Sequence, residues 1–394
     1  HCKMPKMRIW LERNLWVFDI LMMALIMATL TYMIKFVPYG VDIKIHNFFL
    51  IEYLENGYFP IPPGYYFLLY LLDLLINYKF QFLISSILLM TGFLWWKFRI
   101  TVKWIFESSS LGISKSYLLA FLFFFLGPIV IPSIDREYWS LGKLSQIIWH
   151  NSTIIAAFPF CLLLVKQTLT WWENYSNQAF LNICLLVVAI LLIKPSFLFC
   201  YLPVFLCYTF YLIKRPSQPF ILAICLSAFS LLLIWAEKIL IFQWDPMVVN
   251  YYSQEDIPRV VLEPFKIWFH YSNEPFLDLL SSIPLTLCFL IFWRNKAFEN
   301  RFFSFSLWTL LLAILIYFIF AETGYREYHG NFYWQIPVAL YLHNLSMLLI
   351  VLKEYQEKNE KSPFRFKIFA SIFSIQVVFG FAYWLRIFFE RIIS

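Results

Sequence analysis

The stretch AFLNICLLVVAILLIKPSFLFCYLPVFLCYTFYLI, residues 179–213, contains two apolar blocks separated by Lys194 and Pro195. Each block is close to the roughly 17–25 residues that a helix needs to cross the hydrocarbon core of a bilayer. Similar blocks recur along nearly the whole chain of 394 residues, of which 61% are apolar and 14% charged, whereas a soluble domain has about 25% charged residues. The sequence therefore predicts an all-α, polytopic transmembrane helical bundle, with residues 1–394 forming a single integral membrane domain.

About eleven segments are expected to cross the membrane. They are 15–34, 80–96, 117–132, 150–166, 179–194, 196–213, 217–240, 276–293, 302–321, 333–352 and 366–388. Lys and Arg gather in every second connection, beginning with the N-terminal tail and including a linker at 353–367. Basic connections tend to remain in the cytoplasm, so we expect the N-terminus to be cytoplasmic. We expect the membrane itself to be a bacterial cytoplasmic membrane. The first connection, 35–79, and the connection 241–275 then lie on the outer face.

This alternation requires that the segment 64–77 does not cross the membrane. Its apolar part has about 13 residues, which is too short for a full span, and it contains Asp73. We expect a re-entrant or interfacial helix on the outer side. A short, tilted span is the alternative.

The stretch VDIKIHNFFLIEYLENGYFPIPPGYYFLLYLL, residues 41–72, places polar groups in the first outer connection. Asp42 and His46 are four residues apart and share one face of a helix. Gly57 suits the left-handed end of that helix, and the prolines that follow favour an extended turn before Tyr65 and Tyr66. An ordinary interfacial loop with Asp42 as the helix N-cap explains the same pattern equally well.

The arrangement resembles the first outer loop of the GT-C glycosyltransferases, polytopic enzymes that use polyprenyl-phosphate-linked sugars. The matching residues are Asp42, Pro62, Pro63, Tyr65 and Tyr66. The resemblance implies a GT-C-like fold and the transfer of a sugar from a polyprenyl-phosphate donor to a glycan, lipid or protein acceptor, with inversion. It also implies that Asp42 is the general base, with His46 orienting it or the acceptor. Many members have a paired acid where this chain has Ile43, so a divalent metal is compatible with the site but not required.

A second polar segment, AETGYREYHGNFYW, covers residues 321–334. Glu322, Arg326, His329 and Asn331 lie at the edge of a span, where charges are costly unless they are paired or hydrated. An Arg suits a phosphate, and a His can move a proton. We expect Asp42 to share one outward cavity with Glu322, Arg326 and His329. A Glu322–Arg326 pair that merely closes the loop is the alternative.

Further residues are candidates for substrate binding. Trp149, His150 and Asn151 combine an aromatic ring with an amide, which suits a sugar, although an interfacial belt of aromatics also explains them. Lys194 and Arg259 are candidates for the lipid phosphate, with snorkelling as the alternative for Lys194. The segments at 149–153 and 322–332 also resemble uncharacterised bacterial membrane proteins linked to surface-polysaccharide synthesis.

Two other functions remain open. A polysaccharide polymerase or ligase that uses lipid-diphosphate glycans needs outer arginines, which Arg136, Arg259 and Arg326 supply. A lipid or sugar transporter predicts charges within the spans and an internal repeat, and we detect no repeat. The sequence contains no P-loop, no dinucleotide-binding glycine motif, no HExxH and no Cys or His spacing for a metal. We therefore expect no nucleic-acid partner, no metal site and no required cofactor.

Overall fold

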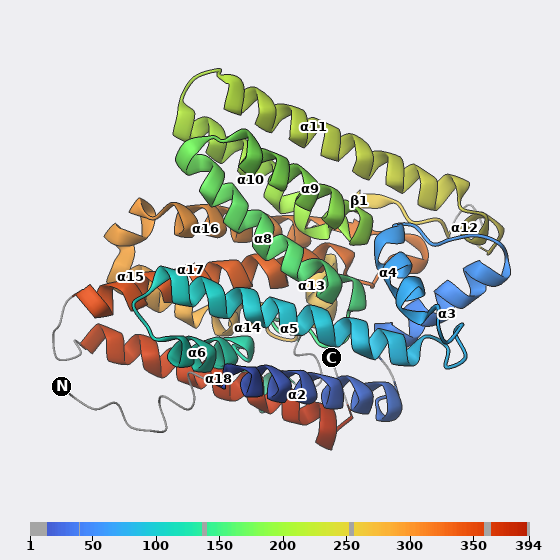
Figure 1. Cartoon of the computed structure of the whole chain (residues 1–394), viewed down its shortest axis with the longest axis horizontal. Helices are drawn as coiled ribbons and strands as arrows, with labels where there is room; N and C mark the ends of the chain where they lie inside the picture. Colours follow the sequence, from blue (N-terminus) through green and yellow to red (C-terminus); the bar gives the residue numbers. More distant parts are fainter. Residues whose placement is uncertain (1–13, 39, 136–139, 252–255, 358–363, 392–394) are drawn as a thin grey trace.

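The computed structural model describes residues 14–38, 40–135, 140–251, 256–357 and 364–391. This part of the chain is almost entirely helical (Figure 1). It contains one small antiparallel pair of strands, β1 (Val260–Leu262) and β2 (Phe320–Glu322), in which Val261 faces Ala321. The prediction of an all-α bundle is confirmed at this level.

Eight helices of the described residues are long and apolar enough to cross a membrane, counting the short turns that continue three of them. They are α2 (Leu15–Phe36), α5 (Leu83–Ser108), α8 (Ser152–Asn174), α10 (Leu198–Ile213) with η1 (Pro195–Phe197), α11 (Gln218–Ile239) with η2 (Leu240–Trp244), α16 (Arg301–Ile319), α17 (Ile336–Glu357) with η4 (Asn331–Gln335) and α18 (Phe364–Phe389). A ninth span is formed if α14 (Pro275–Ser282) and α15 (Pro284–Glu299), which are bent by 57°, cross together. The predicted count of about eleven is not confirmed, since α6 (Ile113–Phe124) and α9 (Asn177–Ile193) are shorter.

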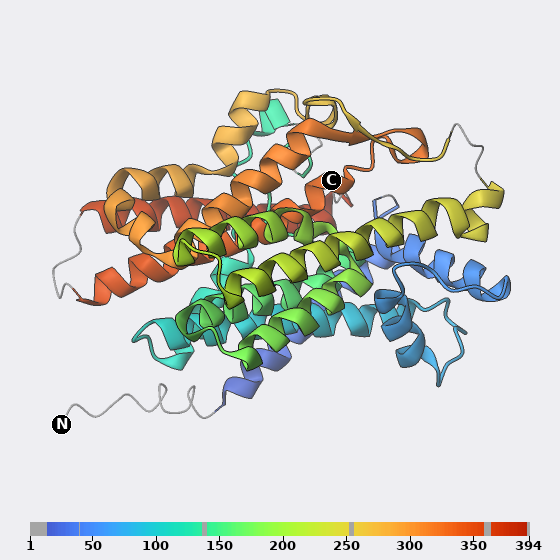
Figure 2. The same cartoon turned by 90° about the horizontal axis from the view of Figure 1, so that it is seen from above.

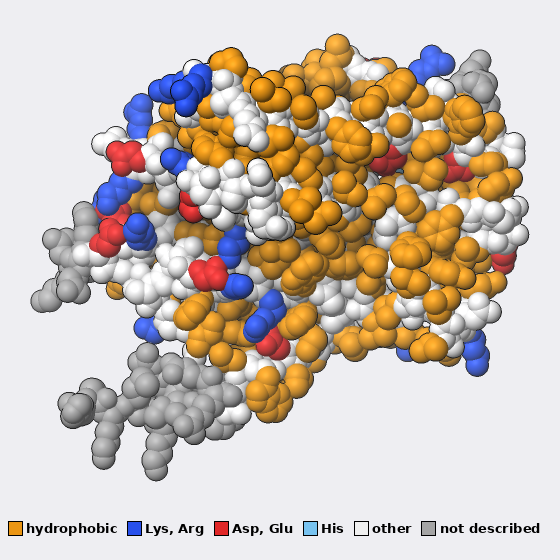
Figure 3. All heavy atoms as spheres, turned by 45° about the horizontal axis from the view of Figure 1, so that its top comes forward, with side chains coloured by type: hydrophobic (Ala, Val, Ile, Leu, Met, Phe, Trp, Pro, Cys, Tyr) orange, Lys and Arg blue, Asp and Glu red, His pale blue; other side chains and the backbone are white. Residues whose placement is uncertain are grey.

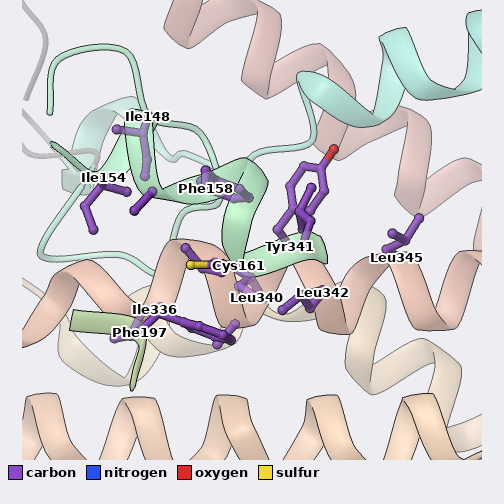
Figure 4. Close-up of a cluster of buried hydrophobic side chains, with 14 of the residues drawn as sticks. Ile148, Ile154, Phe158, Cys161, Phe197, Ile336, Leu340, Tyr341, Leu342 and Leu345 are labelled. Carbon is purple, nitrogen blue, oxygen red and sulfur yellow. The ribbon is translucent and has the colours of Figure 1, made fainter. Parts of the chain in front are cut away.

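Helix α17 is the central helix of the bundle. In its most apolar window 94% of the residues are buried, against 22% for α11, which lies at the edge of Figure 1. Figure 4 shows side chains of α8 and α17 packed together, among them Phe158 and Tyr341, whose ring centroids are 5.2 Å apart. The exposed side chains of α11 are large and apolar, as expected for a surface that faces lipid. Figure 3 shows a broad hydrophobic surface of this kind, with Lys and Arg gathered at one end.

The predicted span at 117–132 is wrong in one respect, because its helix ends at Phe124. From Phe125 to Ile131 the chain is not helical, and its backbone groups bond to other elements. The Gly127 amide donates to the Gln376 carbonyl (3.2 Å), and the Gln376 side chain donates to the Gly127 carbonyl (3.0 Å). The Ile129 amide donates to the Ser281 carbonyl (2.9 Å). Irregular backbone persists at membrane depth only where protein groups satisfy it in this way.

Gly380 of α18 allows this close approach. A Cβ atom at Gly380 would overlap the carbonyl oxygen of Phe125, and one at Gly127 would lie 3.1 Å from the Cα of Gly380. We expect Gly380→Ala to destabilise the protein by about 1–3 kcal/mol or more, because backbone rather than a flexible side chain must move. Denaturant unfolding in detergent micelles measures the change. Gly92→Ala in α5 is the matched control, since its Cβ meets nothing within 4 Å.

A buried ionic cluster lies beside this irregular segment. The Lys143 ammonium is 2.9 Å from a carboxylate oxygen of Asp135 and 2.8 Å from one of Asp278, and it donates to the Ser281 hydroxyl at 2.6 Å. Asp135 belongs to the short α7 (Pro132–Asp135), and Asp278 to α14. The Lys143 side chain is 1% exposed. Charges this deeply buried require partners, so the cluster fixes α7 and the chain around Lys143 to α14.

Two helices form the end of the molecule that carries the candidate site. Helix α3 (Asp42–Glu55) ends in a turn in which the Tyr58 amide donates to the Tyr53 carbonyl (2.8 Å) and Gly57 has a φ of +77°. This confirms the predicted left-handed end at Gly57. Val41, not Asp42, occupies the N-cap position, and Asp42 lies in the first turn. The alternative of Asp42 as N-cap is therefore wrong.

Helix α4 (Pro63–Asp73) has 11 residues, which is about 16 Å at 1.5 Å per residue. It is too short to cross a bilayer alone, as predicted. Of the other short elements, α12 (Pro246–Tyr251) packs against η2, α13 (Lys266–Tyr271) packs against α16, and η3 (Gly324–Arg326) follows β2. In Figure 2 the blue α3 and α4 lie at the same end of the bundle as the yellow end of α11. The predicted linker 353–367 is shorter than expected, because α17 continues to Glu357 and α18 begins at Phe364.

Candidate functional site

Six charged or titratable side chains from three parts of the chain form one electrostatic group, named here the Asp42 cluster. Its members are Asp42, His46, Lys194, Glu322, Arg326 and His329. Burial lowers the pKa of the three bases His46, Lys194 and His329, and the charges of Asp42 and Arg326 act on each of them. Because the electrostatic effect of one charge on another falls off with distance, these side chains lie near one another. The expected convergence of Asp42 with Glu322, Arg326 and His329 is therefore present in the structure.

His46 lies at the centre of the Asp42 cluster. Its Nδ1 atom is hydrogen-bonded to the Tyr66 hydroxyl at 2.6 Å, and its ring lies against the rings of Tyr65 and Tyr66, at 5.8 and 5.7 Å between centroids. Burial lowers the pKa of His46 to about 4; Asp42 raises it, and Lys194 and Arg326 lower it further. His46 is therefore neutral at pH 7.

Asp42 lies one helical turn before His46 on α3 and is partly exposed. Among the described residues, no hydrogen bond or ion pair engages its carboxylate. A carboxylate that is near two cations yet bonded to neither is available to a ligand. This is the property that a general base needs.

Lys194 lies in the break between α9 and η1. Its ammonium is 3.4 Å from the side-chain oxygen of Asn151 and 5.7 Å from the centre of the Trp334 ring. Asn151 in turn accepts from the Ile154 amide (3.2 Å) and so caps α8. Burial lowers the pKa of Lys194 to about 8; Asp42 raises it, Arg326 lowers it and Glu322 raises it. This lysine remains mostly charged at pH 7.

Arg326 is a cation without a carboxylate partner among the residues that the structure describes. Its guanidinium lies over the rings of Phe242 and Tyr325, at 4.9 and 5.5 Å from their centroids. Glu322 instead accepts a hydrogen bond from the Asn331 amide. The alternative in which Glu322 and Arg326 pair to close the loop is therefore wrong, because Glu322 belongs to strand β2 and Arg326 to a separate 3-10 turn.

His329 and Asn331 follow the same turn. Partial loss of hydration lowers the pKa of His329, Arg326 lowers it further, and the carboxylates of Glu322 and Asp42 act in the opposite direction. A small hollow next to the Asp42 cluster is lined by Glu322, Asn331, Glu327 and apolar residues. Its walls come from α13, α16 and the segment 320–332.

Two candidates, Trp149 and Arg259, do not belong to the Asp42 cluster. Trp149 is packed in the core against Phe124 and Phe125, at 5.6 and 6.3 Å between centroids, and is 1% exposed, so its ring cannot stack on a sugar. Arg259 forms backbone hydrogen bonds with Thr323, and its exposed side chain does not act on the bases of the Asp42 cluster. Arg136 lies outside the described residues. His150 is closer: its ring is 5.4 Å from that of Trp334, and its pKa, lowered by burial, responds to Asp42 and Lys194.

The sequence did not point to Tyr53 and Asp245 as neighbours of the site. The Tyr53 hydroxyl donates to a carboxylate oxygen of Asp245 at 2.7 Å, although the two residues are 192 positions apart. Burial raises the pKa of Tyr53, Asp245 raises it further, and Tyr66 and Tyr325 also contribute. Asp245 additionally accepts from the Met247 amide (2.9 Å) at the start of α12. This pair joins α3 to the connection 241–275.

Within the described residues, no group of three or more His, Cys, Asp or Glu side chains is placed to hold a metal ion. The sequence matches no protein-family model, and a search of curated proteins gave no match.

Proposed function

We propose that this chain is an integral membrane glycosyltransferase that moves a sugar from a polyprenyl-phosphate donor to a glycan, lipid or protein acceptor. The observation that supports this function is the Asp42 cluster. Within the described residues, a carboxylate with no hydrogen bond or ion pair, two cations without carboxylate partners and a neutral histidine lie together, with His46 bonded to helix α4 through Tyr66. The resemblance of the first connection to GT-C enzymes points in the same direction.

In the proposed reaction an acceptor hydroxyl attacks the anomeric carbon of the donor sugar. A bond forms between the acceptor oxygen and this carbon, the bond between the carbon and the phosphate oxygen breaks, and the lipid phosphate leaves with the electron pair. Asp42 takes the proton of the hydroxyl. Lys194 and Arg326 stabilise the negative charge that develops on the phosphate, where fixed cations are most effective. A single displacement inverts the anomeric carbon.

The proposed orientation follows the distribution of basic residues. The Asp42 cluster lies on the outer face of the cytoplasmic membrane, and the N-terminus is cytoplasmic. A lipid-linked donor reaches the site from the bilayer, and the acceptor approaches from the aqueous side.

The test uses purified protein in detergent with a radiolabelled polyprenyl-phosphate sugar and candidate acceptors, followed by separation of the products. Transfer of the label to an acceptor is the expected result. A parallel reaction contains a lipid-diphosphate glycan, and transfer only in that reaction would favour a polymerase or ligase. Movement of an intact lipid across proteoliposomes without transfer would favour a transporter.

The charge of Lys194 gives the site a pH dependence. The pKa of Lys194, lowered by burial to about 8, means that its positive charge is present below this pH and is lost above it. Binding of the donor phosphate is expected to weaken as pH rises past about 8. In Lys194→Arg the charge persists to much higher pH, so the weakening should move out of this range. Donor binding measured from pH 6 to pH 10 checks this, and identical profiles for both proteins would exclude Lys194 from the phosphate site.

A further inference from the structure

The hydrogen bond between Tyr66 and His46 can run in either direction, and the surroundings distinguish the two cases. If Nδ1–H of His46 donates to Tyr66, the Tyr66 hydroxyl proton needs a second acceptor, and no described residue provides one. If Tyr66 donates to Nδ1, one bond of 2.6 Å satisfies the hydroxyl proton. Leaving a buried donor unsatisfied costs about 1–3 kcal/mol. The second arrangement is therefore favoured.

The protonation states agree with this direction. Burial raises the pKa of the Tyr66 hydroxyl, so that it keeps its proton. Burial also lowers the pKa of His46 to about 4, so the ring carries one proton at neutral pH. If Nδ1 accepts from Tyr66, that proton lies on Nε2. Within the described residues no protein group accepts a hydrogen bond from Nε2.

We propose that Tyr66 is a positioning residue that fixes His46 as the Nε2–H tautomer, so that His46 donates a hydrogen bond to an oxygen of the ligand in the Asp42 cluster. This role rests on the proposed function. This tautomer assigns different roles to the two candidate residues on α3, Asp42 and His46. Asp42 accepts the proton of the acceptor, and His46 supplies a neutral donor to a phosphate or sugar oxygen. A ring nitrogen that already carries a proton cannot serve as the base.

The neighbouring Tyr65 provides a matched control. It precedes Tyr66 on α4 and is equally buried, and its ring also lies against His46. Its hydroxyl, however, makes no hydrogen bond to His46 and lies instead near the hydroxyls of Ser86 and Ser152. Removal of this hydroxyl changes the packing by one atom and leaves the bond to Nδ1 intact. Of the two variants, Tyr65→Phe and Tyr66→Phe, only the second removes the hydrogen bond to His46.

The test is nitrogen NMR of the full chain in lipid bilayers, with ¹⁵N in the imidazole rings. The signals of His46 are identified by their absence from His46→Gln. In the wild type, Nε2 is expected to carry the proton and Nδ1 to be an unprotonated acceptor. Tyr66→Phe should yield a mixture of tautomers, and Tyr65→Phe should match the wild type. A protonated Nδ1 in the wild type, or an unchanged Tyr66→Phe spectrum, would overturn the proposal.

A transfer assay tests the functional part. Tyr66→Phe is expected to lower kcat/KM by about threefold to tenfold, the effect of one hydrogen bond, with Tyr65→Phe near wild type. His46→Gln, whose amide can replace Nε2–H, should retain more transfer than His46→Asn, whose shorter amide replaces Nδ1. Equal loss in both would overturn the donor role. If the wild type transfers no sugar, the proposed function fails, whereas the tautomer is judged by NMR alone.

Discussion

Replacing Asp42 with Asn is expected to lower the rate of sugar transfer by about 10²–10⁴-fold, the usual effect of losing one general base. The amide preserves the shape of the side chain in the first turn of α3 but cannot take up a proton at neutral pH. The carboxylate makes no hydrogen bond or ion pair within the described residues, so its loss should not destabilise the fold. Binding of the donor and the unfolding transition should both remain close to wild type.

The measurement is turnover of the radiolabelled donor by protein purified in detergent, with donor binding measured separately. Glu55→Gln is the matched control, because Glu55 is an exposed carboxylate at the other end of the same helix. Arg326→Ala should behave differently and weaken donor binding as well as turnover, since it removes a cation near the phosphate. Wild-type turnover by Asp42→Asn would mean that Asp42 only stabilises the start of α3 through its charge.

Lys143→Met is expected to destabilise the protein by about 3–5 kcal/mol. The substitution removes the cation from a site in which Asp135 and Asp278 are almost completely buried. Breaking a buried pair leaves an uncompensated charge, which is far more costly than the pair's net contribution to stability. Denaturant unfolding in detergent, followed by tryptophan fluorescence, measures the loss.

The control for this experiment is Lys266→Met. Lys266 also contacts two carboxylates, those of Glu263 and Glu327, but its side chain and theirs are 29%, 41% and 37% exposed. Exposed pairs contribute about 0–1 kcal/mol, so the effect should be small. The triple variant Lys143→Met, Asp135→Asn, Asp278→Asn should recover part of the lost stability, because no charge remains to be buried. If Lys143→Met unfolds at the same denaturant concentration as the wild type, the cluster does not hold α7 and the chain around Lys143 to α14.

The helices could be predicted from hydropathy because burial in lipid depends on local composition. The bounds of α3 and the turn at Gly57 also followed from local signals, namely a four-residue spacing and a residue that tolerates positive φ. The end of α6 near Phe124 has a local signal, because Gly127 and Pro128 follow it and such a pair disfavours helix, but a span assigned by hydropathy passes over this pair. The bonding of Gly127 to Gln376 could not be predicted, since no local pattern records a contact between residues so far apart.

The site residues also divide into those that local sequence patterns reveal and those that they do not. The sequence revealed Asp42, His46 and the segment 322–332 because polar groups at the edge of a span are energetically costly and therefore indicate a functional site. Trp149 was misassigned because a tryptophan near a span end is equally expected in an interfacial belt or in the core. The contact between Tyr53 and Asp245 joins two segments whose separation in sequence conceals their proximity. The tautomer of His46 depends on a single contact with Tyr66 and has no signature in sequence.

The segment after Phe124 also constrains how the protein is made. Its peptide groups enter the bundle long before their partner is synthesised, because Gln376 follows Gly127 by 249 residues. During translation the Gly127 carbonyl must therefore be satisfied by water, by lipid headgroups or by the insertion machinery. The bundle closes only when α18 arrives and Gly380 lets it approach Phe125. The final packing of this segment therefore requires α18, a helix that is made near the end of synthesis.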